Sequence, residues 1–200
     1  MKKSSFNKLS AALLLLAVVI INACNKDEGI QFGTSVNASS GLEALSGWDK
    51  DFFSNNNWTM GLIFKTAKNG RVTHIGARLA KGSYKVALWD SSAQSILASA
   101  NITVTDSTQY AFADISDISI TAGKSYVVSV NNTDLITTDF KDYFVFDSQG
   151  PSYNFPRTVG DITFTGYLEK NTTEGTSMFP AVYNEDYFIG PPAFKFEPQL

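Results

Sequence analysis

The amino-acid sequence predicts an all-β protein, an antiparallel β-sandwich of the immunoglobulin-like or jelly-roll kind, and three observations lead to this prediction. From Trp58 onward, apolar and polar residues alternate with a period of two, which is typical of strands with one face in a core and one in water. Turn-forming residues separate the alternating stretches. No stretch after Cys24 shows sustained helical spacing with caps. Several short strands of this kind favour a sandwich, with a closed barrel as the structural alternative.

The strands can be read in chain order from four stretches, around residues 60–64, 84–88, 126–130 and 162–166. Their apolar members are expected to face the core: Met60, Leu62, Phe64, Tyr84, Val86, Leu88, Tyr126, Val128, Val130, Ile162 and Phe164. The separating turns contain Gly, Pro or Asn: Lys68-Asn69-Gly70, Lys81-Gly82, Thr121-Ala122-Gly123, Gly150-Pro151 and Gly190-Pro191-Pro192. Trp89 is also placed among the core aromatic residues. A further strand is expected over residues 72–79.

The first 23 residues have the pattern of a secretory signal peptide. Residues 1–10 are polar and contain three lysines but no acidic residue, and residues 11–21 form an unbroken apolar run. A membrane-spanning helix needs about 20 apolar residues, so this run is too short to span. It fits the apolar region of a signal peptide.

Cys24 is the only cysteine of the chain, so no intramolecular disulfide can form. It follows Ile21-Asn22-Ala23, and this segment resembles the lipobox of bacterial lipoproteins. The resemblance implies acylation of the Cys24 thiol, cleavage after residue 23 and acylation of the new amino terminus. An uncleaved signal anchor with a chance cysteine is the alternative.

The charged residues Lys26-Asp27-Glu28 follow the cysteine. They resemble the signal that sends Bacteroidetes lipoproteins to the outer face of the outer membrane, and a solvated start of a linker is the alternative. Residues 24–46 are rich in Gly, Ser, Asn and Ala. We expect them to form a lipidated tether, with room for one early strand near its end, and residues 47–200 to form the sandwich domain. The expected location is the outer membrane, with the domain facing the cell exterior.

The charge of the chain argues against nucleic acid as a partner. Loss of residues 1–23 removes three of the 16 basic residues and none of the 19 acidic ones, so the formal charge falls from −3 to −6. Nucleic-acid binding requires clustered basic residues that replace counterions. An acidic domain is also not attracted to an anionic membrane, so the membrane must be reached through acyl chains.

Three segments resemble, in order, the blocks of a bacterial domain known as domain of unknown function 4082. They are "GLIFKTAKNGRVTHIGARL", "YKVALWDSSAQSILASA" and "ISITAGKSYVVSV". Later, "FPRTVGDITFTGY" and "FPAVYNEDYFIGPPAFKF" resemble the final segments of its lipoprotein versions. The likeness covers residues 58–197, and Trp89-Asp90 and Ala122-Gly123 are its most specific parts. A Gly-Trp-Gln motif of the family is replaced here by "TQYAFADIS". The resemblance implies a β-sandwich and a surface location, and it brings no catalytic residues.

No arrangement of residues predicts catalysis. We expect no enzyme and no cofactor, and we assign no metal ligand. His74 is the only histidine and is placed on the polar face of its strand, opposite Ile75 and Leu79. It has no G-x-S-x-G nucleophile to serve. Glu169 or Glu174 could pair with Glu185 or Asp186 for glycoside hydrolysis, but chance solvated carboxylates are the favoured account. A calcium site around Asp134, Asp139 and Asp142 stays open.

Aromatic residues make up 13% of the chain, and some of them lie in turn-rich sequence. Four are candidate ligand contacts: Tyr153, Phe155, Tyr183 and Tyr187. They fall in two loops, residues 150–157 and 181–189. Exposed rings beside amides and carboxylates suit sugars, whose apolar faces stack on rings. Rings folded back onto the sandwich edge are the alternative.

These features favour a lipid-anchored surface lipoprotein with a non-catalytic binding domain, with an extracellular glycan as the expected ligand. The alternative is a structural or assembly component that docks on another envelope protein.

Overall fold

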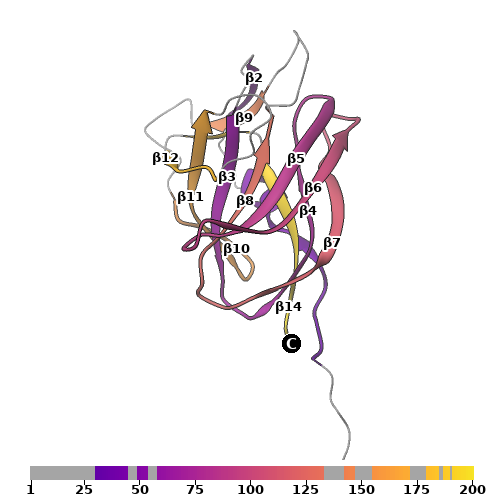
Figure 1. Ribbon diagram of the computed structural model, residues 1–200, viewed down its shortest axis with the longest axis vertical. Helices are drawn as coiled ribbons and strands as arrows, with labels where there is room; N and C mark the ends of the chain where they lie inside the picture. Colours follow the sequence, from indigo (N-terminus) through magenta and orange to yellow (C-terminus); the bar gives the residue numbers. More distant parts are fainter. Residues whose placement is uncertain are drawn as a thin grey trace, which may run out of the picture. The chain divides into compact units, whose positions relative to one another are not determined.

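The alternating stretches form two antiparallel sheets that pack against each other as an all-β sandwich (Figure 1). The computed structural model describes residues 30–44, 49–53, 58–132, 142–146, 155–171, 179–184, 187–189 and 191–200. Of the two units into which the chain divides, the account below concerns Phe32–Leu200. The prediction of a sandwich is confirmed.

The large sheet has seven strands in the order β10-β11-β3-β8-β5-β6, with β12 paired to β11. Its strands in chain order are β3 (Trp58–Thr66), β5 (Gly82–Asp90), β6 (Ser95–Val104), β8 (Tyr126–Asn131), β10 (Arg157–Val159), β11 (Ile162–Asn171) and β12 (Val182–Asn184). In Figure 1, β11 and β3 lie on the left of this sheet and β5 and β6 on the right.

The small sheet has four strands in the order β1-β14-β4-β7. They are β1 (Val36–Asn37), β4 (Gly70–Ala77), β7 (Ala111–Ile120) and β14 (Pro192–Pro198). A third sheet, in the order β13-β9-β2, contains β2 (Asp49–Phe53), β9 (Asp142–Phe146) and β13 (Tyr187–Ile189). One helix, α2 (Ala38–Ala44), is present among the described residues.

The core between the two main sheets is built by the inward faces that the alternation predicts. The eleven apolar residues of the four alternating stretches have exposed fractions of 2% or less. The ring of Phe64 on β3 stacks on Phe194 of β14, with centroids 4.1 Å apart. Burying such a ring contributes about 1.5–3 kcal/mol relative to leaving it in water. Phe64 and Phe194 therefore join the two sheets at the centre of the core.

The strand that carries His74 is observed at Gly70–Ala77 rather than over residues 72–79. Its pairing with both neighbours shifts register near Thr73. A bulge of this kind adds one residue to a strand, so Val72 and Ile75 can both be fully buried. His74 lies half-buried on the opposite face, as the sequence predicts.

Residues 32–44, which the sequence analysis includes in the tether of residues 24–46, pack on the domain in the structure. Gly33 donates its backbone N–H to the carbonyl of Pro198 at 2.7 Å. Ala38 and Leu42 are buried in the core between the sheets, and Ser39 Oγ donates to the carbonyl of Pro192 at 2.8 Å.

Local physical chemistry explains the short helix in this segment. Asn37 precedes the helix, and its Oδ1 accepts from the N–H of Ser40 at 3.4 Å, as a residue at the N-cap position does. Ala38 and Leu42 are four positions apart and share one helical face. The helix has 7 residues and contains only this one buried apolar pair. A single pair is too short a pattern for the helix to be recognised from the sequence.

Several predictions fall outside the described residues. They concern Cys24, the triplet 26–28, Asp134, Asp139, Tyr153, Glu174, Glu185 and Asp186. Among the described residues, none of the helical structure is long and apolar enough to cross a membrane.

Candidate functional site

The candidate binding surface is the outer face of the large sheet, where Trp89 lies. Trp89 is buried, with an exposed fraction of 4%, but it does not belong to the core between the sheets. Its register partner on β8 is Val127, and it packs with Ala87, Val127 and Leu168 in a second apolar cluster. The indole Nε1 donates to Ser129 Oγ at 2.7 Å. Because residues alternate between faces along a strand, this cluster lies on the face opposite Leu88.

Residues 179–183, called the strap below, cover this cluster. The ring of Phe179 meets Trp89 edge to face, with centroids 5.5 Å apart. Pro180 lies over Gly61 of β3, so closely that a Cβ on Gly61 would fall 2.7 Å from Pro180 Cγ. The strap then leads into β12, where Tyr183 pairs with Leu168 of β11. It therefore crosses the outer face from β5 to β11.

Two glycines allow the strap to lie this close to the sheet. Gly61 lies beneath Pro180, and Gly166 lies beneath the ring of Tyr183. A side chain at either position would need the strap to move, since real Cβ atoms do not approach other atoms this closely. Glycine is the residue that permits such close backbone approach.

Tyr183 is the predicted ligand residue that the structure presents to solvent. Its exposed fraction is 51%, and one edge of its ring rests on Gly166. Phe155, in contrast, is half-buried and packs against the core between the sheets, which fits a ring folded back on the sandwich. Tyr153 lies outside the described residues, and Tyr187 begins β13 but its side chain is outside them as well. The described residues therefore place Tyr183 and Phe155 in different surroundings.

Asp90, which follows Trp89, organises the turn between β5 and β6. Its Oδ1 accepts from the backbone N–H of Ser92 at 3.0 Å and of Ala93 at 3.1 Å, and from Ser92 Oγ at 2.7 Å. Its Oδ2 lies 2.6 Å from Lys124 Nζ. The hydrogen bond from Lys124, followed by those from Ala93 and Ser92, holds the pKa of Asp90 well below its usual value. The same pair raises the pKa of Lys124.

The turn that supplies Lys124 is shaped by its neighbours. Gly123 has a φ of 76°, which favours glycine. Tyr126 uses its hydroxyl oxygen to accept the N–H of Thr121 at 3.0 Å. The sequence did not predict that Asp90 and Lys124 would pair, although an Asp two residues before a Ser is a known signal for a local turn.

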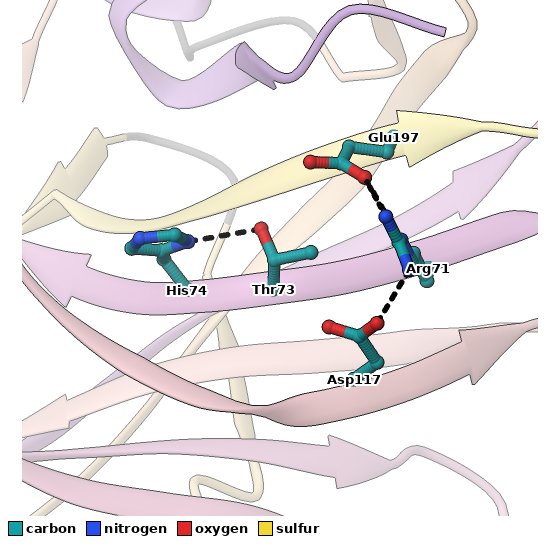
Figure 2. A network of polar contacts seen from close by, with 5 residues as sticks. All are labelled: Arg71, Thr73, His74, Asp117 and Glu197. Atoms are coloured by element: carbon teal, nitrogen blue, oxygen red, sulfur yellow. Dashed lines mark hydrogen bonds and ion pairs between the residues drawn. The ribbon is translucent and has the colours of Figure 1, made fainter. Parts of the chain in front are cut away.

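The outer face of the small sheet carries a network of charges centred on Arg71 (Figure 2). Arg71 on β4 donates to Glu197 of β14 at 2.8 Å and to Asp117 of β7 at 2.6 Å. The ring of Phe32 lies against the guanidinium, 4.1 Å from its central carbon. The hydrogen bond with Glu197 is the main reason why the pKa of Arg71 is raised. Arg71 thus joins three strands and uses its donors within the domain.

His74, also in Figure 2, lies beside this network and shares a hydrogen bond between its Nδ1 and Thr73 Oγ1 at 2.9 Å. Across the neighbouring strands its register partners are Lys195 and Asp114. Thr73, which supplies this hydroxyl, is buried, with an exposed fraction of 7%. Within the described parts of the chain, no group of three or more His, Cys, Asp or Glu residues is placed to hold a metal ion.

The chain was compared with known families and with curated proteins. The family model described as "Domain of unknown function (DUF4082)" matches residues 49–189. None of the curated proteins matches the chain. Two of the sequence blocks that resemble the family meet in the structure. Trp89 and Asp90 belong to the block "YKVALWDSSAQSILASA", and they contact Ser129 and Lys124, respectively, of the block "ISITAGKSYVVSV". The chain belongs to the DUF4082 family.

Proposed function

We propose that this protein is a lipid-anchored, non-catalytic binding domain whose ligand is an extracellular glycan. The anchor is Cys24, whose thiol is acylated and which becomes the acylated amino terminus once residues 1–23 are removed. The proposal rests on the short apolar run, on the position of the sole cysteine and on the acidic character of the mature chain. Because charge cannot hold such a domain to an anionic surface, two or more acyl chains would supply the attachment.

The observation that carries the glycan proposal is the half-exposed ring of Tyr183 on a rigid scaffold. Its exposed fraction is 51%, and its position is fixed by pairing with Leu168 and by contact with Gly166. The exposed part of this ring offers an apolar face on which a sugar can stack.

The test is binding of the mature chain, residues 25–200, to a glycan array, followed by titration of the strongest ligand. Tyr183→Ala should weaken binding roughly 5- to 100-fold, since a ring buried on a ligand contributes about 1–3 kcal/mol. Tyr183→Phe keeps the ring and should retain most of the affinity. Val182→Ala is a matched control, because Val182 is the neighbouring residue and is 58% exposed. A Tyr183→Ala protein that is folded and binds as tightly as the unchanged chain would refute the site.

We also propose that the domain faces the cell exterior, on the resemblance of Lys26-Asp27-Glu28 to an export signal. Protease added to intact cells should degrade the protein, and replacement of the triplet by Ala should protect it. Equal protection of both forms would indicate a lipoprotein that faces the periplasm instead.

A second candidate function is assembly with another envelope protein. One observation favours it, namely that β6 exposes the apolar side chains of Ile96 and Leu97, with exposed fractions of 46% and 37%.

A further inference from the structure

One end of the sandwich is closed by short turns that hydrogen bonds tie together. Ala67 donates its backbone N–H to the carbonyl of Asp161 at 2.7 Å, and Gln199 donates to the carbonyl of Asn69 at 2.8 Å. The side-chain oxygen of Asn69 accepts from the N–H of Ala122 at 2.9 Å. This end, called the floor below, lies at the bottom of Figure 1, where the C-terminus is marked. It consists of residues 67–69, 91–94, 121–125, 160–161 and 199–200.

The chain enters the sandwich at the floor. Phe32, the first residue of the described domain, forms a β-bridge with Gln199. Gly33 donates to the carbonyl of Pro198 at 2.7 Å. Phe32 is eight positions after Cys24, and a chain of this length spans at most about 26–29 Å when fully extended. The linker of residues 25–31 therefore limits how far the floor can move from an anchored Cys24.

We propose that the floor faces the lipid bilayer that holds the acyl chains of Cys24. This inference rests on the lipid anchor of the proposed function. The short linker keeps the floor within about 30 Å of the bilayer surface. β4 rises from the floor at Gly70 and ends at Ala77, so the opposite end of the sandwich is about 25 Å further away. That end meets the bilayer only if the extended linker runs back along the whole sandwich.

The balance of charge at the floor also favours a bilayer as its partner. The charged residues of the floor are Lys68, Lys124 and Asp161, and Asp90 directly precedes it. Lys68 Nζ lies 3.5 Å from Asp161 and Lys124 Nζ lies 2.6 Å from Asp90, so each carboxylate has a cation beside it. The formal charge of this set is zero, whereas that of the mature chain is −6. Because anionic lipid repels acidic surfaces, the floor approaches a bilayer at a lower electrostatic cost than the rest of the domain.

The floor presents an apolar side chain beside a lysine. Lys68 and Leu200 line the same open hollow. Leu200 has an exposed fraction of 79%, the highest of the large apolar residues that the structure describes. A leucine can contact the boundary of the headgroup layer while a neighbouring lysine keeps its ammonium group among polar groups.

This orientation holds the proposed glycan site away from the bilayer. Tyr183 pairs with Leu168 of β11. Leu168 is six positions after Ile162, where β11 leaves the floor, so Tyr183 lies about 20 Å above the floor. A ligand outside the membrane can therefore reach Tyr183 while the floor faces the lipid.

Energy transfer from a dye on the protein to acceptor-labelled lipid tests which end is nearer the bilayer. The chain carries a histidine tag in place of residues 1–24 and is bound to vesicles of phosphatidylcholine, nickel-chelating lipid and acceptor-labelled lipid. Lys68→Cys and Lys81→Cys then each supply the only thiol. Both lysines are exposed, and Lys81 lies at the opposite end, directly before β5. The two variants therefore lose the same charge at opposite ends of the sandwich.

The Lys81→Cys label should show roughly half the transfer of the Lys68→Cys label or less, because it lies about 25 Å further from the bilayer. A Gly/Ser insertion of about 30 residues after Glu28 should remove this difference, since the domain can then turn over on its linker. Circular dichroism first establishes that each variant is folded. If a lysine variant is not folded, Ala67→Cys and Gln109→Cys replace the pair, because both positions are exposed and lie at the same two ends.

Equal transfer from the two labels on the short linker overturns the proposal, as does greater transfer from the Lys81→Cys label. A difference that survives the long insertion overturns it too, because the linker is then not its cause. The nickel-bound vesicles make this result independent of acylation. A protein that carries its own residues 1–24 and stays in the soluble fraction refutes the Cys24 anchor, whereas the vesicle measurement still decides which end faces the lipid.

Discussion

Lys124 Nζ lies 2.6 Å from Asp90 Oδ2, and this ion pair joins two turns that lie far apart in the sequence. Asp90 also binds the backbone of its own turn. One residue before it, Trp89 is held by Ser129 on the strand that follows Lys124. The sequence motif Trp89-Asp90 and the turn Ala122-Gly123-Lys124, which carry the resemblance to the family, are therefore held together as one structural unit.

The depressed pKa of Asp90 predicts a specific loss of stability in acid. A carboxyl with a lower pKa in the folded state binds fewer protons there than in the unfolded chain, so it stabilises the fold at any pH above its unfolded pKa of about 3.9. That contribution is lost as the pH falls below about 4 toward the lowered folded value. Asp90→Asn should lower the melting temperature at pH 7 by roughly 2–6 °C, and the difference from the unchanged chain should shrink by pH 2–3. Lys124→Met should show a similar loss at pH 7. A constant difference across this pH range would contradict the assignment.

Removing Phe179 should loosen the strap without unfolding the sandwich. Phe179 covers Trp89 edge to face and is itself half-buried, so Phe179→Ala should cost about 1–3 kcal/mol of stability in urea unfolding. Trp89 should then become more exposed, and its fluorescence should shift to longer wavelength. The chain has three tryptophans, so a parallel series on a Trp89→Phe background identifies the source of the shift. A shift that persists on that background would contradict the prediction.

Gly61→Ala should displace the strap, because Gly61 lies in the sheet directly beneath it. The added methyl group would meet Pro180 and Val127 of the sheet's outer face, and forcing extra volume into a packed site costs about 1–3 kcal/mol. Protease digestion should cut the variant within or beside the strap faster than the unchanged chain. Gly33→Ala is the comparison, because its nearest neighbours, side-chain atoms of Pro198 and Leu200, lie 3.2 and 3.3 Å from the added atom and Leu200 is 79% exposed.

The helix α2 should contribute to stability, contrary to the behaviour of a tether. Leu42 is fully buried, so Leu42→Ala should lower the free energy of unfolding by about 2–5 kcal/mol. A chain that begins at residue 47 should be less stable than one that begins at residue 32. Leu200→Ala, at a residue that is 79% exposed, should change stability by less than about 0.5 kcal/mol. Equal stability of the two truncated chains would show that the helix is dispensable.

Cys24→Ser should abolish metabolic labelling with a fatty-acid analogue and release the protein from membranes. The thiol is the proposed site of acylation, and serine offers no thiol to the modifying enzyme. The remaining sequence contains no second cysteine, so unchanged labelling would exclude this anchor.

The sequence by itself determined the fold class, because side-chain alternation is a local property of each strand. Met60, Leu62 and Phe64 had to share one face whichever strands lie beside them, and they are buried as predicted. The polar position of His74 followed from the same period. The helix Ala38–Ala44 was not predicted, since one buried pair, Ala38 and Leu42, is too short a pattern to recognise.

The tertiary structure alone decided which of the two apolar faces each aromatic residue occupies and what covers it. Trp89 reads as a core residue in the sequence, but it lies on the outer face beneath the strap, because residues 179–183 return across the sheet. The sequence places both Phe155 and Tyr183 in loops. In the structure, however, Phe155 packs against the core, whereas Tyr183 is exposed. The cause is the same in each case, since contacts between distant segments are set by chain topology, and local alternation carries no information about it.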